Sequence, residues 1–100
     1  MISEEWFIYV LECSDGSLYT GITKNITARL EAHNSQKGAK YTRSRVPCKV
    51  IASCVVGNKS EALKAEIRFK RFSRQQKLEK ISDGIQVFVD SLFPKKLNQD

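Results

Sequence analysis

Two tyrosines, an arginine and the single histidine of this chain have side chains that could act together on one ligand. Tyr9 and Tyr19 place hydroxyl groups on either side of a short turn sequence. Arg29 and His33 are four residues apart, so a helix would present them on one face. A planar guanidinium suits phosphate oxygens, and an imidazole can take up a proton near neutral pH. Each side chain also has a structural interpretation: core aromatic, surface arginine, or histidine at a helix end.

The turn between the two tyrosines belongs to a predicted β-hairpin. Trp6–Glu12 and Ser17–Ile22 are rich in aromatic and β-branched residues, which is typical of strands. The sequence Ser14-Asp15-Gly16 separates them. It suits a two-residue Asp-Gly loop or a three-residue loop in which Gly16 takes a positive φ. We favour the three-residue loop.

The length of this loop decides whether the two tyrosines share a face of the sheet. A two-residue loop would place Tyr9 and Tyr19 on opposite faces, because side chains alternate along a strand. The three-residue loop pairs Tyr9 with Gly21 and Leu11 with Tyr19, so both hydroxyl groups lie on one face. The sequence therefore predicts a shared site, with Gly21 leaving space across from Tyr9.

Caps, breaks and hydrophobic spacing predict the other elements. Asn25 and Ser60 are predicted helix N-caps, and Ser73 with Gln76 resembles a capping box. Leu63 and Ile67 are expected in the buried stripe of the long helix. The further elements are, in order, a helix over Ile26–Asn34, an exposed basic loop over Ser35–Pro47, a strand over Lys49–Val56, a helix from Ser60 to about Phe72, a helix to about Ile81 and a helix over Ile85–Phe93.

Both faces of the predicted hairpin are apolar, and this determines the expected fold class. Ile8, Val10, Leu18 and Ile22 line one face, while Leu11 adds apolar surface to the tyrosine face. We expect an α/β fold, specifically an α+β sandwich: a three-stranded, mainly antiparallel sheet with helices on both faces. One domain over residues 1–100 is expected, with a core at about residues 5–80 and a polar tail at 94–100.

Composition narrows the class of protein. The 100 residues are 41% hydrophobic and carry a formal net charge of +6, as in a basic globular chain. Cys13, Cys48 and Cys54 have no C-x-x-C spacing, which predicts buried free thiols rather than a zinc site or a disulfide framework. No apolar run approaches the length of a membrane span. The acidic N-terminus lacks a signal-peptide core, so we expect a cytoplasmic protein without membrane contact. We also expect a monomer or weak oligomer.

Basic residues gather in two stretches of the chain. Lys37 to Lys49 holds five basic residues and no acid, and Lys64 to Lys80 holds seven beside two glutamates. Such clusters favour a phosphate-backbone partner, although a solvated surface gives the same pattern. The candidate nucleic-acid-binding residues are Lys37, Lys40, Tyr41, Arg43, Arg45 and Lys70.

The order of these residues resembles that of a known family. Phe7-Ile8-Tyr9 followed by Tyr19-Thr20-Gly21 is similar to the paired motif of GIY-YIG nuclease domains. Arg29 on the first helix and Glu66 on the helix after the third strand follow in the family's order. The stretch "LYTGIT…RL..HN…GAKYTRSR" resembles the small stand-alone bacterial members.

The resemblance implies a metal-dependent DNA endonuclease that hydrolyses phosphodiester bonds, with a role in DNA repair or recombination. Glu66 would hold one divalent ion, Mg²⁺ or Mn²⁺, because a lone carboxylate suits an ion that keeps several waters. Arg29 would stabilise charge on the phosphate. Tyr9 or Tyr19 would align or deprotonate the attacking water, and His33 is a further candidate proton acceptor.

A tyrosine base needs help at neutral pH, because the reference pKa of its hydroxyl is about 10. Cationic neighbours lower such a pKa, and Arg29, His33 and Lys40 are the expected ones. The chain also departs from the family pattern. Phe7 stands where the first motif has glycine, and the downstream asparagine of larger members has no clear counterpart.

Two other functions are compatible with the sequence. One is a nucleic-acid-binding module with weak or no catalysis, which the missing asparagine and the lack of a separate targeting domain favour. The other is a protein-interaction domain whose basic face meets an acidic protein. Contacts to the nucleic-acid backbone would suit either DNA or RNA, and the sequence does not distinguish them.

Overall fold

The computed structural model describes residues 5–35 and 45–94. Its elements follow the predicted order of strands and helices. They are β1 (Trp6–Glu12), β2 (Leu18–Thr23), α1 (Ile26–Asn34), β3 (Lys49–Gly57), α3 (Lys59–Lys70), α4 (Arg74–Asp83) and α5 (Ile85–Leu92). Most of the basic loop that the sequence predicts lies outside the described residues.

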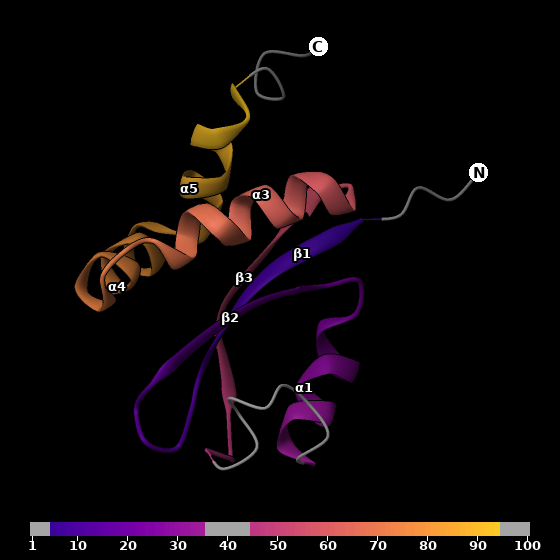
Figure 1. Cartoon of the computed structure of the whole chain (residues 1–100), viewed down its shortest axis with the longest axis vertical. Coiled ribbons are helices and arrows are strands. Elements are labelled where there is room, and N and C mark those ends of the chain that lie inside the picture. The colour runs from indigo at the N-terminus through magenta and orange to yellow at the C-terminus, as the bar shows by residue number, and fades with distance from the viewer. Residues whose placement is uncertain (1–4, 36–44, 95–100) are drawn as a thin grey trace.

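The three strands form one antiparallel sheet in the order β2-β1-β3, so β1 is central and β2 is an edge strand. Figure 1 shows the strands running between two groups of helices, with α3, α4 and α5 on one side and α1 on the other. The predicted sheet with helices on both faces is confirmed. Within the described ranges, no helix combines the length and the apolar character needed to cross a membrane.

The hairpin has the three-residue loop. The Gly16 N–H donates to the Cys13 carbonyl at 2.9 Å, and the Cys13 N–H donates to the Ser17 carbonyl at 2.9 Å. Gly16 has φ 83°, the left-handed conformation that closes this turn. Tyr9 therefore pairs with Gly21 and Leu11 with Tyr19, as predicted from the turn sequence.

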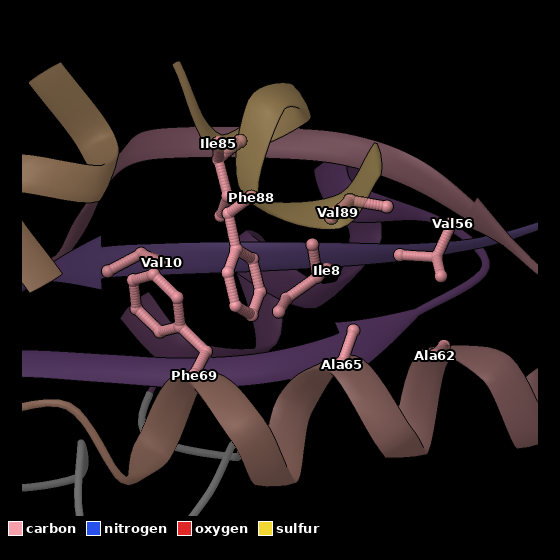
Figure 2. Close-up of a cluster of buried hydrophobic side chains, with 9 residues drawn as sticks. All are labelled: Ile8, Val10, Val56, Ala62, Ala65, Phe69, Ile85, Phe88 and Val89. Carbon is pink, nitrogen blue, oxygen red and sulfur yellow. The ribbon is translucent and has the colours of Figure 1, made fainter. Parts of the chain in front are cut away.

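The larger hydrophobic core lies between the sheet and helices α3 and α5. In Figure 2, side chains from both helices converge on residues of β1. This core consists of Ile8, Val10, Val56, Ala62, Ala65, Phe69, Ile85, Phe88 and Val89. Alanine at two successive contact positions allows the backbone of α3 to approach the sheet closely.

The predicted buried stripe of α3 is wrong. Leu63 and Ile67 are 40% and 53% exposed, whereas Ala62, Ala65 and Phe69 are buried. Both sets have helical spacing, but they differ by about one residue, or roughly 100° of rotation around the helix. Hydrophobicity alone favours leucine and isoleucine on the buried face of α3. The short distance between the helix and the sheet instead favours the small alanines there.

A smaller core lies under α1, on the face that carries the tyrosines. It contains Tyr9, Leu11, Cys13 and Cys48, with Ile26 and Leu30 of α1 packed against them. All three cysteines are free thiols, and Cys13 and Cys48 are buried with their sulfurs 3.2 Å apart. Burial raises the pKa of the Cys48 thiol to about 12, so it remains protonated.

Helix caps fix where the functional helices begin. The Asn25 side chain accepts from the Ala28 N–H and so starts α1 as predicted, and Ser73 and Gln76 form the predicted capping box. The predicted Ser60 cap is wrong, because Asn58 caps α3 through a capping box with Glu61. Asn and Ser are similar as N-caps, and the reciprocal glutamate three residues after Asn58 decides between them.

Candidate active site

The hydroxyl group of Tyr9 lies at the centre of a buried hydrogen-bond chain. Its oxygen is 3.1 Å from Nε2 of His33 and 3.4 Å from Nε of Arg29. An arginine side chain can only donate, so the Tyr9 oxygen accepts from Arg29. The tyrosine proton then points to the His33 nitrogen, which accepts it when the imidazole carries its own proton on Nδ1. The three groups form a chain that leads from a cation to a proton acceptor.

Three elements bring this cluster together. Tyr9 comes from β1, Tyr19 from β2, and Arg29 and His33 from adjacent turns of α1. The ring centroid of Tyr19 lies 6.3 Å from that of Tyr9 and 5.1 Å from that of His33. Four of the five predicted catalytic side chains thus share one face of the hairpin.

Gly21 is what leaves room for the Tyr9 ring. A Cβ atom at position 21 would lie 2.5 Å from the Tyr9 hydroxyl oxygen and 2.7 Å from Cζ. Such distances are well inside van der Waals contact, so the ring occupies the space that a side chain would fill. The register of the hairpin and the glycine together hold the hydroxyl beside Arg29 and His33.

Burial dominates the ionisation of this cluster. Tyr9 is only 2% exposed, and burial raises the pKa of its hydroxyl although the hydrogen bond from Arg29 lowers it. Arg29 lowers this pKa as expected, but burial outweighs it, and the expected neighbour Lys40 lies outside the described residues. Burial, and secondarily the charge of Arg29, lower the pKa of His33. The hydrogen bond to Tyr9 raises the pKa of Arg29, which stays charged.

Glu66 lies on α3, half-buried, with 17% of its side chain exposed. Its Oε2 is 3.2 Å from Nζ of Lys70, one helical turn later. The carboxylate charge is among the causes that raise the pKa of Tyr9, so Glu66 is within electrostatic reach of the tyrosine cluster. The carboxylate already holds one cation, the lysine ammonium.

The candidate nucleic-acid-binding residues are only partly described. Lys37, Lys40, Tyr41 and Arg43 lie outside the described residues. Arg45 donates from Nε to Asp15 Oδ2 at 3.0 Å, and its carbonyl accepts from the Ser14 N–H at 2.8 Å. Arg45 is therefore bonded to the hairpin turn through both its side chain and its backbone. The charge pattern alone did not indicate this structural contact.

Two basic residues of α4 that were not among the predicted site residues lie close to the hairpin. Arg74 donates from Nη1 to the Gly16 carbonyl at 2.7 Å, and Lys77 lines a cavity together with Tyr19. Both belong to the basic stretch from Lys64 to Lys80. The number of basic residues identified the stretch as a whole. The hydrogen bond of Arg74 to Gly16 and the place of Lys77 in the cavity distinguish these two residues from the others.

Comparisons with known proteins identify the family of this chain. A family model described as the GIY-YIG catalytic domain matches residues 5–79. The chain belongs to the GIY-YIG family. The matched span contains every residue of the tyrosine cluster and Glu66.

Small bacterial GIY-YIG relatives match most of this chain. A UPF0213 protein of Streptococcus agalactiae is 53% identical over 78 residues, covering 78% of this chain and 89% of the relative. A UPF0213 protein of Cupriavidus pinatubonensis is 49% identical over 77 residues, covering 77% and 86%.

Two solution NMR structures share the fold. The UPF0213 protein of Bacillus halodurans is 42% identical, with a TM-score of 0.52 over 78% of this chain and 83% of that one. A protein from E. faecalis is 40% identical, with a TM-score of 0.57 over 82% and 90%. At this level of identity and coverage, both structures share the fold of this chain.

The residues of this GIY-YIG site fit a hard divalent cation. Among the described residues, no group of three or more histidine, cysteine, aspartate or glutamate side chains could enclose a metal ion. Glu66 offers a single carboxylate, which suits Mg²⁺ or Mn²⁺ because such ions take oxygen ligands and keep waters. Oε2 of Glu66 is paired with the Lys70 ammonium, which a metal ion at this oxygen would have to replace.

The protonation of His33 gives a direct test of the buried cluster. His33 is the only histidine of the chain, so one imidazole resonance reports it. Because its pKa is lowered in the folded protein, we expect an NMR titration midpoint below the reference value of about 6.5. The same chain unfolded in urea serves as the control and should titrate near 6.5.

The lowered pKa of His33 also predicts how stability depends on pH. Between the folded and the unfolded pKa of His33, the unfolded chain binds more protons, so the free energy of unfolding decreases as the pH falls. A folded midpoint at or above 6.5, or a stability independent of pH in this window, would contradict the buried neutral imidazole.

Proposed function

We propose that this protein is a divalent-metal-dependent nuclease that hydrolyses phosphodiester bonds in DNA. The observation that carries the proposal is the hydrogen-bond chain Arg29–Tyr9–His33, buried beside Tyr19 and within electrostatic reach of Glu66. Tyr9 and His33 are buried and Arg29 is partly buried, so the chain runs from the partly exposed guanidinium into the interior. A hydrolytic site needs a cation, a positioned hydroxyl and a proton acceptor.

The proton of the attacking water would leave through a tyrosine hydroxyl to His33. Because the pKa of Tyr9 is raised, Tyr9 would act as a neutral relay. It would pass its own proton to Nε2 of His33 as it accepts the proton that the attacking water gives up. The lowered pKa of His33 keeps the imidazole neutral and ready to accept. Tyr19, half-buried at the edge of the cluster, is the tyrosine that is open to the substrate.

Two groups would carry the charge of the phosphate. Arg29 is a fixed cation, and its guanidinium offers further donors beyond the Nε that binds Tyr9. Glu66 would hold the divalent cation, which when bound neutralises charge on the phosphate oxygens and the leaving oxygen. Hydrolysis then adds the water oxygen to phosphorus and breaks one P–O bond, and the leaving oxygen takes up a proton.

A second candidate is a DNA-binding module that does not cleave. The salt bridge between Lys70 and Glu66 favours it, because the lysine occupies the carboxylate that catalysis requires. The Lys70 side chain is 51% exposed, whereas that of Glu66 is only 17% exposed. A divalent cation on Glu66 would therefore have to replace the lysine at a partly buried carboxylate, and the metal-dependent cleavage assay decides whether it does.

A cleavage assay with metal removal tests the proposal. Purified protein is incubated with nicked, branched and single-stranded DNA, the structures that arise in DNA repair and recombination, with Mg²⁺ or Mn²⁺ and with a chelator. We expect cleavage of at least one substrate with metal and none with chelator. Salt-dependent binding of all three without any cleavage would instead establish the binding module.

A further inference from the structure

A cavity of about 430 Å³ lies next to the candidate active site, where the open edge of the sheet meets α3 and α4. It is lined by Leu18, Tyr19 and Thr20 of β2, Lys70 of α3 and Lys77 of α4. The volume is in the range of small-molecule sites. Tyr19 belongs both to this cavity and to the tyrosine cluster, so whatever fills the cavity adjoins the reacting group.

The backbone of β2 presents polar groups to this cavity. Because the Cys13 N–H donates to the Ser17 carbonyl, Ser17, Tyr19 and Gly21 are the positions that bond to β1. Backbone groups alternate along an antiparallel strand, so Leu18 and Thr20 direct their N–H and C=O groups to the open edge. The lining of the cavity thus combines backbone groups of β2 with the side chain of Leu18, and Tyr19 adjoins it from the same edge strand.

One hydrogen bond joins the helix that carries Lys77 to the hairpin turn. Arg74 lies three residues before Lys77, on the same face of the helix. The Arg74 guanidinium donates to the Gly16 carbonyl at 2.7 Å, which holds this face against the hairpin turn. Lys77, half-buried, lines the cavity beside β2.

The charge of the cavity is positive. Its charged lining residues, Lys70 and Lys77, are both cations, and none of the described residues that line it is acidic. Glu66 is paired with Lys70 at 3.2 Å, and a divalent ion on Glu66 would release that ammonium toward the cavity. Two ammonium groups and backbone N–H donors above a partly apolar floor are suited to a phosphate with its attached sugar or base.

We propose that this cavity binds the nucleotide next to the scissile phosphate. Lys77 and Lys70 contact its phosphate, while Leu18 and the Tyr19 ring contact its sugar or base. The assignment of the scissile phosphate to the tyrosine cluster rests on the proposed function, but binding in the cavity does not require cleavage. The substrate class is then a polynucleotide strand, held on at least one side of the bond that is cut.

Binding of a single-stranded DNA oligonucleotide, followed by fluorescence anisotropy without divalent ions, tests the subsite. We expect Lys77→Ala to weaken binding several-fold and to reduce the slope of log K against log salt by about 0.7, the value for one lost phosphate contact on a single strand. Lys64→Ala, at an exposed position of α3 outside the cavity, serves as the matched control and should change both quantities less. Lys77→Arg should restore the slope.

Methylphosphonates, which replace a charged phosphate by an uncharged group, identify the phosphate of the oligonucleotide that Lys77 contacts. When single methylphosphonates are moved along the oligonucleotide, the wild type should lose affinity most at one position. Lys77→Ala should not show that loss, because the contact is already missing. Equal effects of Lys77→Ala and Lys64→Ala, or the same methylphosphonate profile in wild type and Lys77→Ala, would overturn the subsite even if the protein cleaves DNA. Lys77-dependent binding without cleavage would overturn the nuclease proposal and leave the subsite standing.

Discussion

Replacing Glu66 by glutamine should abolish metal-dependent DNA cleavage while leaving DNA binding close to that of the wild type. Glutamine keeps the size of the side chain, so the half-buried position on α3 is filled as before. It removes the carboxylate charge that would hold a divalent cation, and electrostatic groups of this kind contribute about 10²–10³-fold in rate. We therefore expect cleavage to fall at least about 100-fold.

The measurement compares cleavage rates with anisotropy of DNA binding for the same preparations. Glu79→Gln, which removes an exposed carboxylate from α4, is the matched control and should cleave like the wild type. Loss of the Lys70 partner should also leave binding unchanged or slightly stronger, because the ammonium becomes available to phosphate. Cleavage by Glu66→Gln at the wild-type rate would show that this carboxylate holds no catalytic metal.

The features of the site that short-range chemistry determines could be predicted from the sequence. Ser14-Asp15-Gly16 encodes the loop, the loop sets the register, and the register brings Tyr9, Tyr19 and Gly21 together. A spacing of four residues likewise placed Arg29 and His33 on one face of α1. In each case the deciding interactions lie within a few residues of one another.

Features that depend on how elements pack could not be predicted in this way. The buried face of α3 follows from its close approach to the sheet, so the alanines are inside and Leu63 and Ile67 are outside. The pKa of Tyr9 depends on the competition between burial and Arg29, and burial prevails. Lys77 is one of several similar lysines until the contact of Arg74 with Gly16 fixes α4 against the hairpin.

Gly21→Ala should inactivate the protein, although it adds one methyl group and touches no charged residue. The new Cβ would lie 2.5 Å from the Tyr9 hydroxyl oxygen and 3.0 Å from Cε1. The ring is buried and its oxygen is held by Arg29 and His33, so it cannot turn aside without breaking that chain. Overpacking of this kind costs about 1–3 kcal/mol, and because misplacing a reacting group by about 1 Å can cost about 100-fold in rate, we expect a loss of that size in cleavage by the folded fraction.

Gly16→Ala separates this effect from the general cost of replacing a hairpin glycine. A Cβ at position 16 meets no atom within 4 Å, but φ is 83°, so alanine is strained there. We expect Gly16→Ala to lose about 1 kcal/mol of stability and to cleave normally once folded. The His33 titration distinguishes the two variants, because only Gly21→Ala displaces the Tyr9 hydroxyl from Nε2. If Gly21→Ala kept both the cleavage rate and the His33 midpoint of the wild type, the Tyr9 hydroxyl would not be the proton relay, since catalysis would then tolerate its displacement.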